Sequence, residues 1–143
     1  MEKYNIFDGH NDLLLRLWME QDLMGNLFFQ GGKSKKVGTI EISKALGLNQ
    51  EGHIDFDRSM KGSLKGGFFA IFVPNQNMIK TNEHFKKKAQ NSKNLNNYLN
   101  HNYAINSTME MLKIITNMSN LQPKKFKIIK SKSDLTNINL DNQ

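Results

Sequence analysis

The stretch from Ile6 to Asp12 most constrains the fold, because a short apolar run ends there in a His-x-Asp pair. Such a run before a polar loop is typical of a buried parallel strand, and we expect a strand over residues 3–7 with its C-terminal loop over 8–12. Side chains two residues apart in extended backbone project to one side, so His10 and Asp12 can reach one ion. Imidazole and carboxylate both suit zinc. The alternative is a plain turn, since the loop is rich in turn-forming residues.

A second apolar run, over residues 68–73, predicts a strand covered on both faces. Pro74 follows the run and cannot donate a ladder hydrogen bond, so the strand is expected to end there. Before it, Asp55 can cap a short helix over residues 55–64. The pair Gly66-Gly67 is expected to end that helix.

Two segments resemble motifs of the membrane (renal) dipeptidase family. Asp8-Gly9-His10-Asn11-Asp12-Leu13-Leu14 resembles the metal motif of that family's first strand, and residues 52–58 with 66–74 resemble the stretch leading into its second strand. The resemblance implies a (β/α)8 barrel, of the TIM type, in which two bridged zinc ions hydrolyse dipeptides. It also implies that His10 and Asp12 are metal ligands, and it leaves the catalytic residues unassigned.

The length of the chain limits how much of such a barrel it can form. A complete barrel typically needs about 250 residues, whereas this chain has 143. We therefore expect an α/β domain over residues 1–143 that is incomplete, an N-terminal fragment with the first two to three β/α units. Residues 25–52, which are rich in glycine and lysine, are expected to form an insert or lid loop.

The expected partners follow from the resemblance. In the family, a bridging glutamate and further histidines come from later strands, so the fragment alone is expected to be inactive. Its partners would be a dipeptide substrate and the missing C-terminal part of the barrel. The alternative is a non-catalytic, truncated remnant that associates with another protein through open strand edges and apolar helix faces.

The residues that follow the His-x-Asp pair predict a helix over 13–22. Asp12 is able to cap this helix, although a carboxylate bound to metal cannot cap freely at the same time. Trp18 is expected in the core or in a pocket wall. Asp8 has two open roles: to orient the metal ligands through a hydrogen bond or to stabilise the turn.

The C-terminal half predicts a long helix, a third strand and the start of another helix. Towards the end of residues 81–120 apolar residues recur every three to four positions, which fits an amphipathic helix, and Pro123 closes it. The positions expected to pack are Tyr98, Leu99, Tyr103, Ile105, Met109, Leu112, Ile114 and Ile115. We expect the strand over residues 126–129 and the next helix over 131–137.

The other histidines and glutamates of interest carry no metal signature of their own. His84 and His101 form no His-x-x-x-His or Glu-x-x-His pair within the predicted long helix, so we expect them to be exposed. Glu83 and Glu110 also lie in that helix, away from strand ends, where barrel chemistry is built. His53 precedes a helix and is expected to be structural.

Composition excludes several classes of function. The net charge is +7, but the lysine clusters are not interleaved with the aromatic residues that single-strand binders use, so we expect no nucleic-acid partner. The sequence contains no run of 18 apolar residues and no export signal, so we expect no membrane segment. Cysteine is absent, which agrees with a cytoplasmic location.

Overall fold

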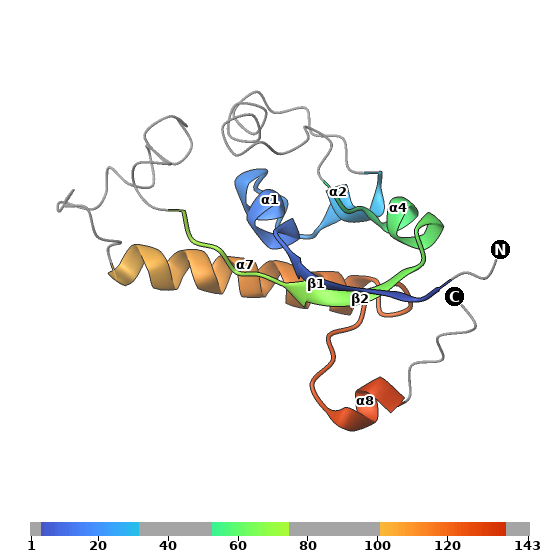
Figure 1. Ribbon diagram of the computed structural model, residues 1–143. Helices are drawn as coiled ribbons and strands as arrows, with labels where there is room; N and C mark the ends of the chain where they lie inside the picture. Colours follow the sequence, from blue (N-terminus) through green and yellow to red (C-terminus); the bar gives the residue numbers. More distant parts are fainter. Residues whose placement is uncertain (1–3, 32–52, 75–100, 137–143) are drawn as a thin grey trace.

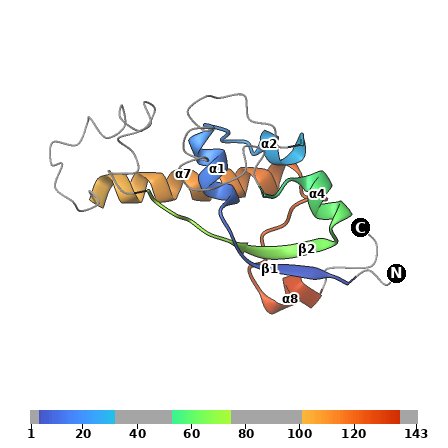
Figure 2. The ribbon, with the colours of Figure 1, turned by 45° about the horizontal axis from the view of Figure 1, so that its top comes forward.

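The computed structural model describes residues 4–31, 53–74 and 101–136 (Figure 1). The elements in chain order are β1 (Ile6–Asn11), α1 (Leu13–Met19), α2 (Asn26–Phe29), α4 (Phe56–Lys61), β2 (Leu64–Phe69), α7 (His101–Leu121) and α8 (Lys132–Thr136). Helices α1, α2 and α4 gather on one side of the two strands, and α8 lies on the other side (Figures 1 and 2). The described residues thus form a mixed α/β structure.

The two strands pair in parallel. A parallel pair needs a crossover between its strands, and α1, α2 and α4 all lie within that crossover. At the C-terminal end of the pair, Asn11 lies opposite Phe69, and the Ala70 N–H donates to the Asn11 carbonyl oxygen at 2.9 Å. The end of β1 is therefore anchored to β2.

The predicted bounds of the first strand are wrong, because β1 extends through Asn11 instead of ending at Phe7. The His-x-Asp pair begins inside the strand and not in a loop after it. Turn-forming residues remain extended here because the neighbouring backbone of β2 pairs with them. Tertiary pairing overrides their local preference.

The second strand is also displaced from its prediction. β2 begins at Leu64 and contains both glycines expected to end the preceding helix, while residues 70–74 form no strand. The approach of β1 explains the glycines. A Cβ at Gly66 would lie 3.2 Å from the Phe7 ring, and a Cβ at Gly67 would lie 3.0 Å from the Asp8 Cβ, so larger residues would push the strands apart.

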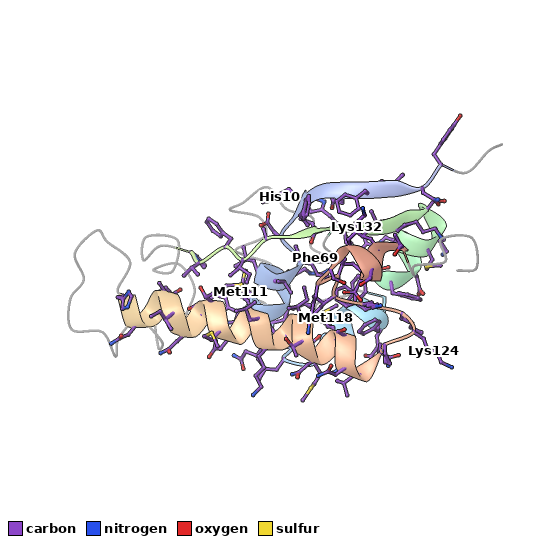
Figure 3. All side chains as sticks on the ribbon, turned by 90° about the horizontal axis from the view of Figure 1, so that it is seen from below. His10, Phe69, Met111, Met118, Lys124 and Lys132 are labelled. Atoms are coloured by element: carbon purple, nitrogen blue, oxygen red, sulfur yellow. The ribbon has the colours of Figure 1, made fainter. Side chains whose placement is uncertain are left out.

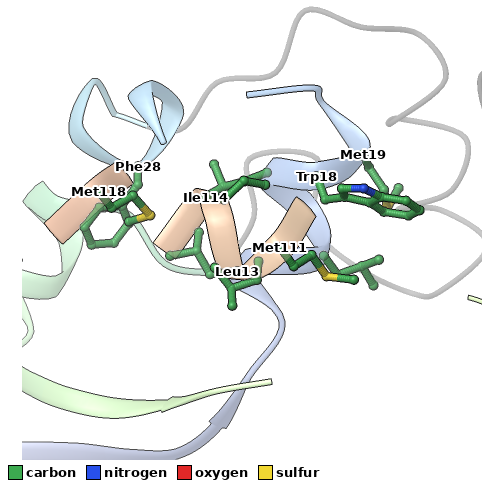
Figure 4. Packing of buried hydrophobic residues seen from close by; sticks show 10 residues of the cluster. Leu13, Trp18, Met19, Phe28, Met111, Ile114 and Met118 are labelled. Carbon is green, nitrogen blue, oxygen red and sulfur yellow. The ribbon is translucent and has the colours of Figure 1, made fainter. Parts of the chain in front are cut away.

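The core lies between α1 and α7 (Figure 4). Helix α1 is buried over most of its circumference, and α7 contributes a single stripe of buried residues. That stripe consists of Ser107, Met111, Ile114 and Met118. The expected packing positions of α7 are therefore partly wrong: Ile114 is buried, but Ile105, Met109 and Leu112 are exposed. Helix α7 has two apolar faces, and only the face that contains Ser107, Met111, Ile114 and Met118 is buried in the core.

A group of phenylalanine rings extends this core towards the sheet. The Phe28 ring contacts the rings of Phe29, Phe56 and Phe126, and Phe126 also contacts Phe69. The third strand predicted over residues 126–129 is not present, since the sheet of the described residues has two strands. The Phe126 N–H donates to the Gln122 carbonyl oxygen in a turn, and its ring is drawn into the aromatic group.

The remaining helices form where the sequence predicts them, but α1 ends at Met19 instead of residue 22 and α4 ends at Lys61 instead of residue 64. Helix α7 ends at Leu121, before Pro123, and α8 covers most of the predicted 131–137 helix. Residues 32–52 of the predicted insert and residues 81–100 of the predicted long helix, with Glu83 and His84, lie outside the described residues. In the described ranges, no helix has the length and apolarity to cross a bilayer.

Candidate metal centre

His10 lies near the C-terminal end of β1 (Figure 3). Asp12 follows the last residue of that strand and precedes the first residue of α1. The His10 Nε2 atom lies 3.5 Å from the Asp12 Oδ1 atom. The side chains are 70% and 41% exposed, respectively, so both are open to an incoming ligand. The predicted projection of the two side chains to one side is confirmed by this distance.

The separation of these two atoms suits a tetrahedral metal. Zinc bonds to histidine nitrogen and carboxylate oxygen of about 2.0–2.1 Å place two ligand atoms of a tetrahedron about 3.3–3.4 Å apart. The observed 3.5 Å is close to that value without any change in the backbone. A nitrogen and an oxygen donor also form a set that zinc accepts. The pair therefore fits zinc, as part of one coordination sphere.

The predicted competition between capping and metal binding at Asp12 does not arise. Asp12 occupies the N-cap position of α1, yet its side chain makes no capping hydrogen bond. The Asn11 Oδ1 atom instead accepts a hydrogen bond from the Leu13 N–H at 3.3 Å. The carboxylate of Asp12 is thus left facing His10. Asn11 was missed at the sequence level, although an asparagine two residues before a helix start is a recognisable signal.

Of the two roles open to Asp8, its hydrogen bond supports the stabilisation of the backbone. Its Oδ1 atom accepts from the backbone N–H of His10 at 3.0 Å. This bond holds the main chain beside the imidazole and not the imidazole ring itself. Asp8 therefore shapes the strand end on which the candidate ligands stand.

No third metal-binding side chain joins this pair within the described ranges, where no group of three His, Cys, Asp or Glu residues is close enough to hold an ion. His53 is exposed before α4, and His101 is exposed at the first residue of α7. The exposure predicted for His101 is confirmed. The Glu110 carboxylate accepts a hydrogen bond from the Trp18 indole N–H and so ties α7 to α1.

Asp55 is a buried carboxylate that serves the fold. As predicted, it caps α4: Oδ1 accepts from the Arg58 N–H at 2.8 Å, and Oδ2 pairs with Arg58 Nε at 2.6 Å. Burial alone raises the pKa of this carboxyl, but the hydrogen bonds from Arg58 and the charges of Arg58 and Arg16 outweigh burial and hold the pKa below its ordinary value. The negative charge of Asp55 is therefore paired with Arg58 within the fold.

A half-buried tyrosine connects α7 to the segment after β2. The Tyr103 hydroxyl donates to the Pro74 carbonyl oxygen at 3.3 Å. Burial raises the pKa of Tyr103 to about 12; the Glu110 charge adds to this and a hydrogen bond with Ser107 opposes it. The phenol therefore stays protonated at neutral pH and acts as a hydrogen-bond donor.

Comparison with known proteins agrees with the motif at the end of β1. The family model described as membrane dipeptidase (peptidase family M19) matches residues 1–143. The chain has no significant match among curated proteins or among solved structures. The match covers the whole chain, including the strand end that carries His10 and Asp12. This protein is a member of the membrane dipeptidase family, peptidase family M19.

Proposed function

We propose that this chain supplies part of the zinc centre of a dipeptidase, with His10 and Asp12 as ligands. The observation that carries the proposal is the 3.5 Å separation of the His10 Nε2 and Asp12 Oδ1 atoms at an open strand end. The family match supports dipeptide hydrolysis as the reaction. The family's use of two zinc ions is carried over with it as part of the proposal.

We further propose that β1, the helices after it and β2 are the opening units of a (β/α)8 barrel. The parallel pairing of the strands and the helical crossover between them support this. The position of the ligand pair supports it as well, because barrel enzymes build their sites at the C-terminal ends of the strands.

In this proposed mechanism, the chain's own residues would hold the metal ion and orient its ligand atoms. His10 would offer an imidazole nitrogen, and Asp12 would offer a carboxylate oxygen, from a backbone fixed by the Asp8 and Asn11 hydrogen bonds. Zinc, when bound, lowers the pKa of a water towards about 7 and polarises the scissile carbonyl. The described residues supply two donors, whereas a catalytic zinc usually has three protein ligands. The remaining ligands are proposed to come from outside the described residues.

The test is zinc binding and dipeptide hydrolysis by the full 143-residue chain. We expect weak zinc binding that is lost in His10→Ala and in Asp12→Ala, because each substitution removes a donor atom. We expect no turnover of an alanine- or glycine-containing dipeptide above background until the rest of a related barrel is added. His101→Ala is the matched control and should bind zinc as the wild type does. Equal loss of binding in His101→Ala would contradict the assignment.

A non-catalytic role in association with another protein is the second candidate, and one observation favours it. Tyr4, Ile6, Phe7 and Phe68 are exposed on and beside the sheet, and the Phe7 and Phe68 rings contact each other edge to face at 5.1 Å. Exposed apolar residues grouped in this way mark surfaces that bind other chains. Zinc-independent binding of a barrel remainder, with no hydrolysis by the assembly, would favour this candidate over the enzyme.

A further inference from the structure

Asn11 is the one polar residue at the end of β1 whose side chain is turned inwards. It is 8% exposed, although both of its neighbours, His10 and Asp12, are open to solvent. A buried carboxamide must be hydrogen-bonded, or its desolvation destabilises the fold. The partners of Asn11 therefore show what the residue does.

The side chain of Asn11 joins two elements. Its Nδ2 atom donates to the Phe68 carbonyl oxygen of β2 at 3.3 Å, and its Oδ1 atom accepts from the Leu13 N–H, the first of α1, at 3.3 Å. Gly67 leaves room for this arrangement, because a Cβ there would lie 3.3 Å from the Asn11 Nδ2 atom. The carboxamide thus fixes the angle at which β1 enters α1.

The contact with Leu13 also fixes the backbone around Asp12. An N-cap aspartate normally accepts a hydrogen bond from the second or third N–H of its helix, here Leu14 or Leu15. The Asp12 side chain makes no capping bond, and its carboxylate lies 3.5 Å from the His10 imidazole. Asn11 accepts from the N–H two residues further on, and the turn that this bond closes holds Asp12 in that direction.

We infer that Asn11 is a positioning residue of the metal centre: by holding β2 and closing the turn to the Leu13 N–H, it orients Asp12 to bind metal together with His10. This inference rests on the proposed function. Asn11 itself does not touch the metal. Residues that orient metal ligands typically change metal affinity about 10- to 100-fold when they are removed.

The experiment compares three variants of the full chain by isothermal titration with Zn²⁺ and by NMR without metal. In Asn11→Ala, the turn over Asp12 is lost, so we expect Asp12 to turn towards the Leu14 and Leu15 N–H groups, which changes its three-bond Hα–Hβ couplings. Zinc affinity should fall about 10-fold or more. In Asn11→Ser, the hydroxyl can still accept the Leu13 N–H, so the couplings and most of the affinity should be retained.

Asp55→Ala is the matched control, because it removes a side-chain cap from α4, away from the metal ligands. It should leave zinc affinity unchanged even if it lowers the melting temperature. Couplings and zinc affinity in Asn11→Ala that match the wild type would overturn the inference. An equal loss of affinity in Asn11→Ser and Asn11→Ala would overturn it too, since the hydrogen bond from the Leu13 N–H would then be irrelevant.

The metal-free couplings separate this inference from the proposed function. If the wild type binds no zinc but Asp12 still reorients in Asn11→Ala and not in Asn11→Ser, the positioning of Asp12 stands and the zinc assignment fails. If Asn11→Ala does not fold, Asn11→Ser decides the matter. Wild-type couplings in that variant support the inference, and altered couplings contradict it.

Discussion

The α1–α7 interface and the β1–β2 sheet are both rich in large apolar residues, but they differ in how these residues are covered. At the interface, Met111 and Ile114 are fully buried beside α1, and Met118, further along α7, is fully buried beside Phe28 of α2 (Figure 4). On the sheet, Phe7 and Phe68 contact each other and remain largely exposed. The interface is a completed core, whereas the sheet presents apolar surface beside a polar strand end. The stability of the fold should therefore depend mainly on the helix interface. Association with other chains should depend mainly on the exposed sheet.

The largest expected effect is at the interface. Ile114→Ala should lower the free energy of unfolding by about 2–5 kcal/mol, since it leaves a cavity at a position with no exposure. Ile105→Ala removes the same atoms from the same helix at a position that is 46% exposed. It should change stability by about 0.5 kcal/mol. Urea denaturation followed by circular dichroism measures both. Equal effects would mean that the two apolar faces of α7 are covered alike.

Gly25, at the start of α2, offers a second test of how tightly the buried face of α7 is packed. Its φ is +72°, and a Cβ there would meet the Met118 side chain, with the sulfur at 2.8 Å. Gly25→Ala should cost about 1–2 kcal/mol for the left-handed backbone and a further 1–3 kcal/mol or so for overpacking.

Gly31→Ala is the control for Gly25→Ala, because φ is +85° there and nothing lies within 4 Å of the added Cβ. Gly31→Ala should lower stability only by the cost of the left-handed backbone, without any cost of overpacking. Thermal melts of the two variants measure the difference. A Gly31→Ala variant as unstable as Gly25→Ala would show that packing against Met118 adds nothing.

The cap of α4 predicts a smaller effect that depends on pH. Asp55→Ala should cost about 1–2 kcal/mol at pH 7, since the cap is lost. The pKa of Asp55 is lowered from 3.8 in the folded chain, so its contribution is present above that pH and is lost as pH falls through the lower folded value. The difference in the free energy of unfolding between wild type and Asp55→Ala should therefore become smaller at acid pH, as measured by urea denaturation. Asp57→Ala, at an exposed position in the same helix, should show no such narrowing.

The smallest expected effect on stability is at the sheet. Phe68→Ser removes a side chain that is 68% exposed and breaks the edge-to-face contact with Phe7, which is worth about 0.5–1.5 kcal/mol. Association should change more than stability, because the exposed apolar surface shrinks. Sedimentation velocity of the wild type and variant measures this. A large loss of stability with unchanged association would reverse the comparison between interface and sheet.

The sequence by itself determined features that depend on neighbours a few residues away. The two-residue spacing of His10 and Asp12 predicted that their side chains project to one side, and the His10 Nε2 atom lies 3.5 Å from the Asp12 Oδ1 atom. Asp55 was identifiable as a cap because its partner is three residues ahead. Helix α7 ends before Pro123 because proline cannot continue a helix. Each of these features is set by local geometry.

Only the tertiary structure decided features that depend on distant partners. Residues 107–118 of α7 became the buried stripe because α1 and the segment around Gly25 and Phe28 pack there, although Ile105 and Met109 are equally apolar. The paired glycines belong to β2 because β1 approaches within contact of them. Asn11 donates to the carbonyl oxygen of Phe68, far along the chain, and so ties the residues around Asp12 to β2. Local sequence preference allows several faces, strand bounds and side-chain directions at these positions. Contact with a distant segment of the chain decides which of them the fold adopts.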